Sequence, residues 1–238
     1  MTIYWTKINK IIDETSEVKT FLLDLPEGFT WEEGAHTHLA LKGFNIGEKP
    51  NKSLVRHMSI CTLPAEQAVG ITTRIKEECS EFKAILKTLT VGDEVALFKI
   101  HSNVPLKRVE KNLYLLSSGV GLATFRPVVQ TYLQDQQGVP SVHALNVDST
   151  KDYLFTDIFT SDQEKNFTAQ YVDTRDAYYA AAEKLAEDKD GLFYVIGSDE
   201  FIKQNIELLF ERGITREQIM LDKREQFIEK FFSADALA

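Results

Sequence analysis

The chain has 238 residues, 43% of them hydrophobic and 26% charged, which is ordinary for a globular protein and long enough for two domains. Its formal net charge is −9, and the imbalance lies in the second half: residues 1–107 hold 13 Lys and Arg against 14 Asp and Glu, whereas residues 108–238 hold 14 against 22. This acidic half argues against nucleic acid and anionic membranes as partners, and no apolar run is long enough for membrane insertion.

The N-terminus and the cysteines bear on where the protein works. The first ten residues alternate polar and apolar side chains and lack the apolar segment of a signal peptide, so we expect a cytoplasmic protein. Cys61 and Cys79 form no C-x-x-C pair. Two thiols are too few for the usual ligation of an iron–sulfur cluster, so we interpret both as free thiols in a reducing compartment.

The first half of the chain is rich in short strands. Runs of alternating or β-branched residues are bounded by Gly, Pro or Asn, and one helix after Ser80 interrupts them, with apolar residues at helical spacing. The expected strands are Ile3–Ile12, Val18–Leu25, His36–Leu41, Ser53–Ile60, Gly70–Lys76 and Glu94–Ile100. Six short strands with one helix predict a small closed antiparallel barrel.

After Pro105 strands and helices alternate. Buried-strand patterns lie at Leu113–Leu116, Val142–Val147, Phe167–Val172 and Leu192–Ile196, and helical patterns lie near Thr124–Gln134, Asp176–Ala186 and Asp199–Arg212. Such alternation predicts βαβ units and a mostly parallel sheet. We therefore expect two domains, a barrel over residues 1–107 and an α/β domain over residues 108–238.

Arg56-His57-Met58-Ser59 lies on the fourth predicted strand. A bound flavin needs a cation at its phosphates, a hydrogen-bonding group near ring atom N5 and an apolar cover for the ring, and Arg56, Ser59 and Met58 have these properties. The spacing is equally typical of exposed polar residues on a strand. Ser80 allows two interpretations as well, an anion site at a helix N-terminus or a plain N-cap, and the nearby Glu77, Glu78 and Glu81 oppose an anion.

A glycine-containing turn follows the first strand of the second half. Gly119 and Gly121 lie between that strand and a helix, where glycines let backbone amides approach a pyrophosphate. Thr124 stands at the last position of the G-x-G-x-x-G pattern, so the motif is incomplete. His36 and His38 face one side of a strand, but no third ligand lies nearby in sequence, and we predict no metal site.

Taken in order, four segments resemble the motifs of the ferredoxin–NADP reductase superfamily, and the resemblance covers nearly the whole chain. They are Arg56–Ile60, similar to its R-x-Y-S flavin motif; Ser80–Lys83, similar to its pyrophosphate helix; Ser118–Arg126, similar to its G-G-x-G-I-T-P-x-R loop; and Phe193–Ser198, similar to its strand ending in C-G-P. The resemblance implies a flavin barrel followed by a nicotinamide-nucleotide domain.

The resemblance also implies roles for individual residues. Arg56 would hold the flavin phosphates, with His57 and Met58 beside it, and Ser59 would act near N5 as the catalytic contact. The other implied cofactor contacts are Ser80 on the FAD pyrophosphate and Gly119, Gly121, Thr124, Gly197 and Ser198 on the nicotinamide dinucleotide.

Three departures from the family pattern bear on function: Met58 stands in place of Tyr, Ile196 in place of Cys and Ser198 in place of Pro. They leave FMN open beside FAD, and they leave open a non-catalytic flavin or nucleotide sensor, or a subunit of a redox complex. We expect an oxidoreductase that takes hydride from NAD(P)H and passes electrons to an unidentified acceptor. Asp148 follows the second strand of the nucleotide domain, where a carboxylate favours NADH over NADPH.

Overall fold

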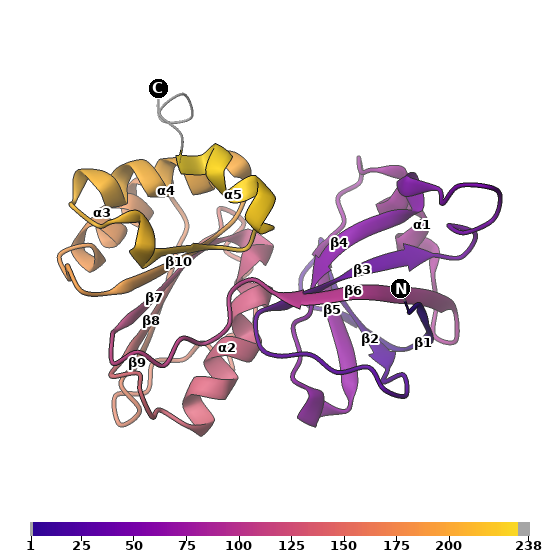
Figure 1. Cartoon of the computed structure of the whole chain (residues 1–238), viewed down its shortest axis with the longest axis horizontal. Coiled ribbons are helices and arrows are strands. Elements are labelled where there is room, and N and C mark those ends of the chain that lie inside the picture. Colours follow the sequence, from indigo (N-terminus) through magenta and orange to yellow (C-terminus); the bar gives the residue numbers. More distant parts are fainter. Residues whose placement is uncertain (1, 233–238) are drawn as a thin grey trace. The chain divides into compact units, whose positions relative to one another are not determined.

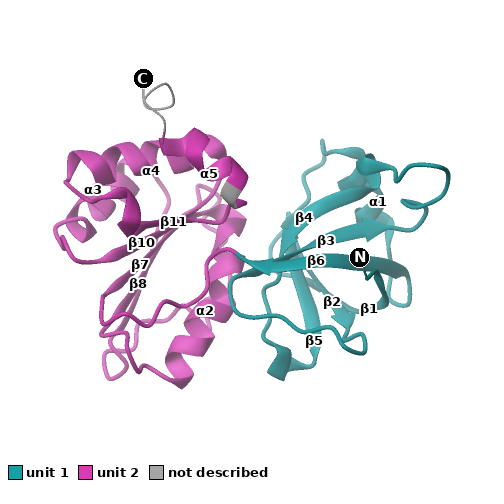
Figure 2. Ribbon diagram, viewed as in Figure 1, with its two compact units in different colours: residues 1–102 teal, residues 103–238 magenta. Residues whose placement is uncertain are grey.

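The structure is a computed structural model, and it describes residues 2–232. The chain divides into two compact units, residues 1–102 and residues 103–238, shown in different colours in Figure 2. Within the described part, no helix has the length and apolar character to cross a membrane.

The first unit is one antiparallel sheet of six strands in the order β4-β3-β6-β1-β2-β5 (Figure 1). Its strands are β1 (Tyr4–Asp13), β2 (Val18–Asp24), β3 (Ala35–Leu41), β4 (Val55–Ser59), β5 (Ala68–Arg74) and β6 (Glu94–Ser102). One helix, α1 (Glu81–Thr88), lies between β5 and β6. The turn from β1 to β2 is closed by the Glu14 amide, which donates to the Val18 carbonyl at 2.9 Å.

Apolar side chains that point to the inner face of these strands form the core of the first unit. Leu39, Val95 and Leu97 are each no more than 1% exposed and pack in one cluster, to which α1 adds Phe82 and Leu86 from positions one helical turn apart. The apolar spacing that predicted this helix is therefore the spacing that buries it.

The two edges of this sheet approach each other just after β4. The Cys61 amide donates to the Gly70 carbonyl on β5 at 2.9 Å. A Cβ atom on Gly70 would lie 2.7 Å from Thr62 Cγ2 and 2.8 Å from Cys61 Sγ, so only glycine allows this approach. The sheet thus curls into the barrel-like form that the sequence predicts.

The second unit is a parallel sheet of five strands in the order β11-β10-β7-β8-β9. The strands are β7 (Leu113–Ser118), β8 (Val142–Val147), β9 (Phe167–Val172), β10 (Leu192–Ile196) and β11 (Ile219–Leu221). The helices are α2 (Leu122–Gln134), α3 (Arg175–Leu185), α4 (Asp199–Glu211) and α5 (Glu225–Phe232). Figure 1 shows α3 and α4 on one side of the sheet and α2 on the other.

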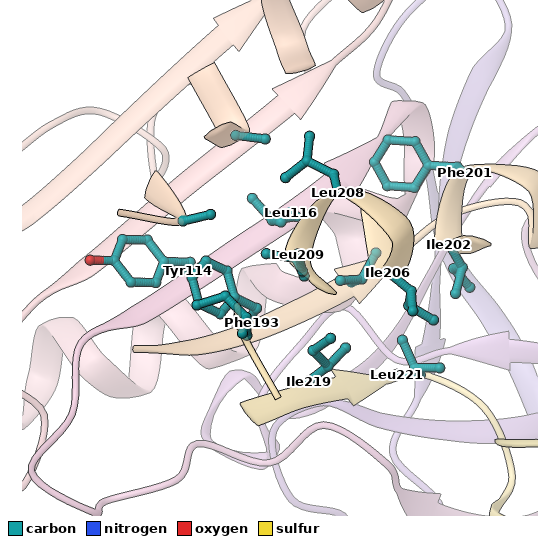
Figure 3. Packing of buried hydrophobic residues seen from close by; sticks show 14 of the residues in the cluster. Tyr114, Leu116, Phe193, Phe201, Ile202, Ile206, Leu208, Leu209, Ile219 and Leu221 are labelled. Carbon is teal, nitrogen blue, oxygen red and sulfur yellow. The ribbon is translucent and has the colours of Figure 1, made fainter. Parts of the chain in front are cut away.

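One large apolar cluster joins this sheet to α3, α4 and α5. Figure 3 shows Ile202, Ile206 and Leu209 of α4 against Leu116 and Phe193 of the central strands. All five side chains are at most 1% exposed. Strands β7 and β10 are buried on both faces, which explains why they are continuous apolar runs rather than alternating ones.

The predicted fold class is confirmed, and β8, β9 and β10 have the predicted bounds. Two elements were not predicted, β11 and α5. Residues 148–166 between β8 and β9 contain no helix or strand, but Leu154 and Phe159 are buried and the Tyr171 hydroxyl donates to the Leu154 carbonyl at 2.7 Å, so this segment is packed onto the sheet.

Candidate functional site

Strand β4 carries the first predicted motif along the edge of the sheet. Arg56 pairs with Leu39 and Met58 with Thr37 on β3, so the two side chains leave β4 on the same face. Met58 is half-buried against the barrel core. The Arg56 guanidinium lies 5.3 Å from the centre of the Phe82 ring on α1, which brings the motif to the first turn of that helix.

Two further cations join Arg56 at the beginning of α1. Lys83 Nζ donates to the Arg74 carbonyl at 2.6 Å. The pKa of the Lys83 ammonium is lowered, first by burial and then by the positive charges of Arg74 and Arg56, while Cys79 acts in the opposite direction. Arg74 also lies 3.9 Å from Glu17. Three cations gathered at one helix start favour a phosphate group.

The hydroxyl of Ser80 lies at this helix start and does not cap it. Ser80 is the N-cap residue of α1, but its side chain makes no capping hydrogen bond. Only its carbonyl is used, accepting from the Ala84 amide at 2.9 Å. An exposed hydroxyl beside the helix N-terminus and the three cations is arranged to donate to an anion.

Ser59 and His57 lie on the opposite face of β4, next to β3. His36 pairs with Ser59 and His38 with His57 across the two strands. The rings of His36 and His57 have their centres 3.7 Å apart, and His101 on β6 lies 5.9 Å from His36. Four of the five histidines of the chain thus gather on this face.

This gathering does not form a metal centre in the structure. Over residues 2–232, no group of three or more His, Cys, Asp or Glu side chains is arranged to hold a metal ion. His36 and His38 are joined by histidines that the sequence pattern did not bring together, and their rings meet in tilted and edge-to-face contacts.

In the second unit, the predicted glycine loop links β7 to α2. Gly119 has a φ of 52°, which favours glycine, and residues Gly119–Gly121 form a 3₁₀ turn before α2. No side chain caps the start of α2 within the described chain, and the Leu122 amide donates to the carbonyls of Gly119 and Val120 in the preceding 3₁₀ turn. Asn146 on β8 fixes the loop, donating to Ser117 Oγ at 2.8 Å and to the Gly119 carbonyl at 3.2 Å.

Gly121 and Gly197 have a packing role as well. A Cβ on Gly121 would lie 3.0 Å from the Ile196 carbonyl oxygen, and one on Gly197 would lie 2.5 Å from Phe201 Cδ1 and 2.8 Å from Ser118 Oγ. Both glycines therefore let the carboxyl ends of β7 and β10 approach the helix starts. Thr124 is in the first turn of α2 and only 2% exposed, so it is enclosed by protein.

Ser198 behaves as an ordinary N-cap. Its Oγ accepts a hydrogen bond from the Phe201 amide at 3.2 Å at the start of α4. Asp199 and Glu200 follow in the first turn of this helix. Their charges disfavour an anion there, in contrast to the α1 and α2 starts.

Three residues form a row across the carboxyl edge of the parallel sheet. Ser118, Val147 and Val172 are paired across β7, β8 and β9, so Gly119, Asp148 and Asp173 follow in line. Asp148 is 5% exposed, and its Oδ1 accepts from the Thr150 amide at 3.0 Å and the Thr150 hydroxyl at 2.8 Å. Its carboxylate is thus occupied in its own turn.

Asp173, which the sequence pattern did not single out, is more accessible. Its carboxylate pairs with Lys151 Nζ at 2.7 Å, and the side chains of Asp173 and Lys151 are 36% and 68% exposed. The hydrogen bond between them lowers the pKa of Asp173 and raises that of Lys151. Lys151, the first cation in the sequence after β8, therefore already has a carboxylate partner.

No protein-family model matches the sequence, and no curated protein is similar to it in sequence. Several solved structures share the fold at low identity. A ferredoxin NADP⁺ reductase from Neisseria gonorrhoeae with bound FAD and NADP has 18% identity and a TM-score of 0.78, over 93% of this chain and 98% of that one.

Two other structures agree with this. The CS-b5R domains of human Ncb5or in the NAD⁺ form have 16% identity and a TM-score of 0.76, over 93% of this chain and 70% of that one. A ferredoxin-NADP⁺ reductase from Plasmodium falciparum has 13% identity and a TM-score of 0.74, over 92% and 95%. The chain therefore has the two-domain fold of ferredoxin–NADP reductases, which confirms the expected architecture.

Proposed function

We propose that the protein is a flavin-dependent reductase that takes hydride from a nicotinamide nucleotide and passes the electrons to an acceptor. The observation that carries the proposal is the convergence of Arg56, Arg74 and Lys83 beside the uncapped hydroxyl of Ser80. Each cation also has a contact within the unit: Arg56 donates to the Val55 carbonyl at 2.7 Å, Lys83 donates to the Arg74 carbonyl, and Arg74 lies 3.9 Å from Glu17. A pyrophosphate would bring more negative charge to this cationic helix start than a single phosphate does, which favours FAD over FMN.

The residues of the first unit have distinct parts in this proposal. Arg56, Arg74 and Lys83 bind the pyrophosphate, with Ser80 donating to it. Met58 offers a polarisable apolar surface to the ring in place of an aromatic side chain. Ser59, the last residue of β4, would contribute a hydrogen bond near the reactive nitrogen from the end of the strand. When bound, FAD supplies the chemistry of accepting a hydride and releasing electrons, while the protein positions it and excludes water.

The second unit supplies a nucleotide cradle at the carboxyl edge of its sheet. The start of α2 would bind the dinucleotide pyrophosphate, and Asn146 holds the Gly119 turn that precedes this helix. Gly197 provides close approach at the end of β10. This is the edge at which open α/β sheets bind ligands.

We further propose that NADH is preferred to NADPH. Asp148 and Asp173 place two carboxylates at the ends of β8 and β9, and Lys151, which a 2′-phosphate would require, is paired with Asp173. Because Asp148 is buried in its turn, Asp173 is the carboxylate better placed to act on the nucleotide.

Replacing Asp173 with Asn tests this preference. The substitution releases Lys151 and removes one negative charge, so the NADPH-to-NADH ratio of flavin reduction rates is expected to rise by up to about five-fold, the size of one screened ion pair. Stopped-flow flavin reduction measures it. Asp176→Asn, an equal change of charge in the first turn of α3, is the matched control. An equal ratio in both variants, or wild type favouring NADPH, argues against the preference.

The function itself is tested on the purified protein. We expect a yellow protein that releases FAD, identified by mass spectrometry, and that NADH bleaches under anaerobic conditions. A protein that stays colourless after incubation with excess FAD and FMN would overturn the flavin assignment. A yellow protein that dithionite bleaches but neither nicotinamide nucleotide does would support a binding protein without reductase activity.

A further inference from the structure

An open cavity of about 550 Å³ lies in the first unit at one end of the barrel. Its volume is within the range of about 300–1,000 Å³ that small-molecule sites occupy. Tyr4 and Trp31 supply aromatic lining, and Ala35 and Ile100 supply aliphatic lining from the ends of β3 and β6. The pyrophosphate residues described above do not line it.

The aromatic lining is rigidly held. Trp31 is 6% exposed, and its indole N–H donates to the Thr62 carbonyl at 2.7 Å. Phe29 packs between Trp31 and Tyr4, with ring centres at 5.5 Å and 5.2 Å. Rings that cannot relax into the space keep it available for a planar ligand.

The charges around the cavity define the kind of ligand. Glu32 and His101 line it and are exposed, and no Lys or Arg is among its lining residues in the described chain. A phosphate-bearing ligand such as free FMN would meet a carboxylate with no cation to balance it. The lining suits a neutral aromatic molecule with hydrogen-bond acceptors, to which the His101 imidazole and the Thr30 hydroxyl can donate.

The cavity is adjacent to the strand pair that carries Ser59. Ala35 lines it, and the Ala35 carbonyl accepts a hydrogen bond at 2.8 Å from the amide of Ile60, the residue after Ser59. His101 pairs with His36 on β3, and His36 pairs in turn with Ser59. The cavity and Ser59 therefore lie at the same end of the barrel, separated by one strand.

We propose that this cavity binds a neutral quinone, which is the electron acceptor of the reductase; the inference rests on the proposed function. The quinone gains two electrons from the reduced flavin across the intervening strand and two protons from solvent through the rim at His101, while the flavin releases its proton to solvent. Both carbonyl groups become hydroxyls, and the flavin returns to its oxidised form. The acceptor class follows from the aromatic lining, the absence of a cation there and the neighbouring Ser59.

Filling the cavity tests the site. Thr30 is exposed and lines the cavity, so Thr30→Trp occupies it without replacing a core residue. With menadione as the quinone, we expect the KM to rise about ten-fold or more while reduction of the flavin by NADH and of ferricyanide by the flavin is unchanged. Lys42→Trp, in the separate cavity bounded by Lys7 and Glu94, is the matched control.

Replacing Glu32, the carboxylate that lines the cavity, with a cation tests which class of ligand binds there, because the variant should gain activity with an anionic ligand. Glu32→Lys is expected to raise kcat/KM for an anionic naphthoquinone sulfonate several-fold relative to menadione. Binding is followed independently by menadione quenching of Trp31 fluorescence in a Trp5→Phe background, because Trp5 and Trp31 are the two tryptophans of the chain.

The outcomes separate the two proposals. An unchanged KM in Thr30→Trp, or an unchanged preference in Glu32→Lys, overturns the quinone site while NADH still bleaches the flavin. Absence of any flavin, or of any flavin reduction by NADH, overturns the proposed function instead. Quenching of Trp31 fluorescence by menadione would then show that the cavity binds a quinone in a protein that is not a reductase.

Discussion

Single residues decide whether the α1 start is a phosphate site. Arg56→Ala removes one of three cations, and the loss of a charge-assisted contact is expected to weaken flavin binding by about ten- to a hundred-fold, or roughly 1.5–3 kcal/mol. Flavin titration of the apoprotein measures this. Lys42→Ala is the control, because Lys42 is 79% exposed and its nearest carboxylate, that of Glu94, is 3.9 Å away. Equal affinities in both variants would show Arg56 to be a surface residue.

Ser80 and Ser198 offer a second comparison at this scale, because both are helix N-caps and only Ser198 uses its hydroxyl for capping. Ser198→Ala is expected to lower the free energy of unfolding by about 1 kcal/mol, the usual value of a cap. Ser80→Ala is expected to leave stability nearly unchanged and to weaken flavin binding. Urea denaturation and flavin titration of both variants check this; a stability loss in Ser80→Ala without an affinity loss would reduce Ser80 to a cap.

At the scale of elements, the glycines between strands and helices hold the nucleotide edge together. Gly121→Val would force branched atoms against the Ile196 carbonyl, which is already 3.0 Å from an ideal Cβ. We expect a loss of about 1–3 kcal/mol in stability, typical of overpacking. Gly213→Ala is the comparison variant. Its added Cβ would meet nothing within 4 Å, so any loss of stability would come from the φ of 77° alone. Equal urea midpoints for wild type and Gly121→Val would mean that the loop relaxes freely.

How far the sequence predicts these elements depends on their length and on periodicity. Strands β7 and β10 are buried on both faces and stand out as apolar runs, whereas β11 has three residues and lacks a pattern. Helix α5 carries an apolar repeat at Phe227, Ile228, Phe231 and Phe232, but it has only eight residues. Apolar periodicity therefore predicted the long strands and helices, whereas the two short elements at the end of the described chain were not predicted.

The site was less predictable than the fold, for a physical reason. Arg56, Ser80 and the glycine loop are local motifs, but Arg74 and Lys83 join them only because β5 and α1 meet in space. Asn146 and Asp173 likewise act on residues of neighbouring strands. No spacing along one chain encodes such contacts, so their signal lies in the three-dimensional arrangement.

For the molecule as a whole, the charge asymmetry between the two halves has a counterpart in the structure. Asp188 accepts hydrogen bonds from the Tyr114 hydroxyl at 2.8 Å and the Asn112 amide at 2.9 Å, which ties the end of α3 to the start of β7. Asp199 binds Lys223 and Lys230 at 2.8 and 2.9 Å, which ties α4 to α5. The acidic unit therefore uses ionised carboxylates to join its elements.

These carboxylates predict how the second unit responds to acid. Burial raises the pKa of Asp188, but its hydrogen bonds outweigh burial and lower it; the pKa of Asp199 is lowered by its bonds to Lys223 and Lys230. A folded-state pKa below the unfolded value of about 4 means that the ionised group stabilises the fold at neutral pH. This stabilisation is lost as the pH falls through the folded-state pKa.

Asp188→Asn should therefore lower the melting temperature at pH 7, and its effect should shrink as the pH falls below about 4 and through the lowered folded-state pKa of Asp188. We expect a loss of about 1 kcal/mol at neutral pH, discounted for partial solvent exposure. Helical circular dichroism is the suitable probe, because both tryptophans lie in the first unit and report nothing directly about the second. Asp190→Asn, which changes an exposed neighbour, is the control. A destabilisation of Asp188→Asn that persists undiminished in acid would mean that shape rather than charge holds this contact.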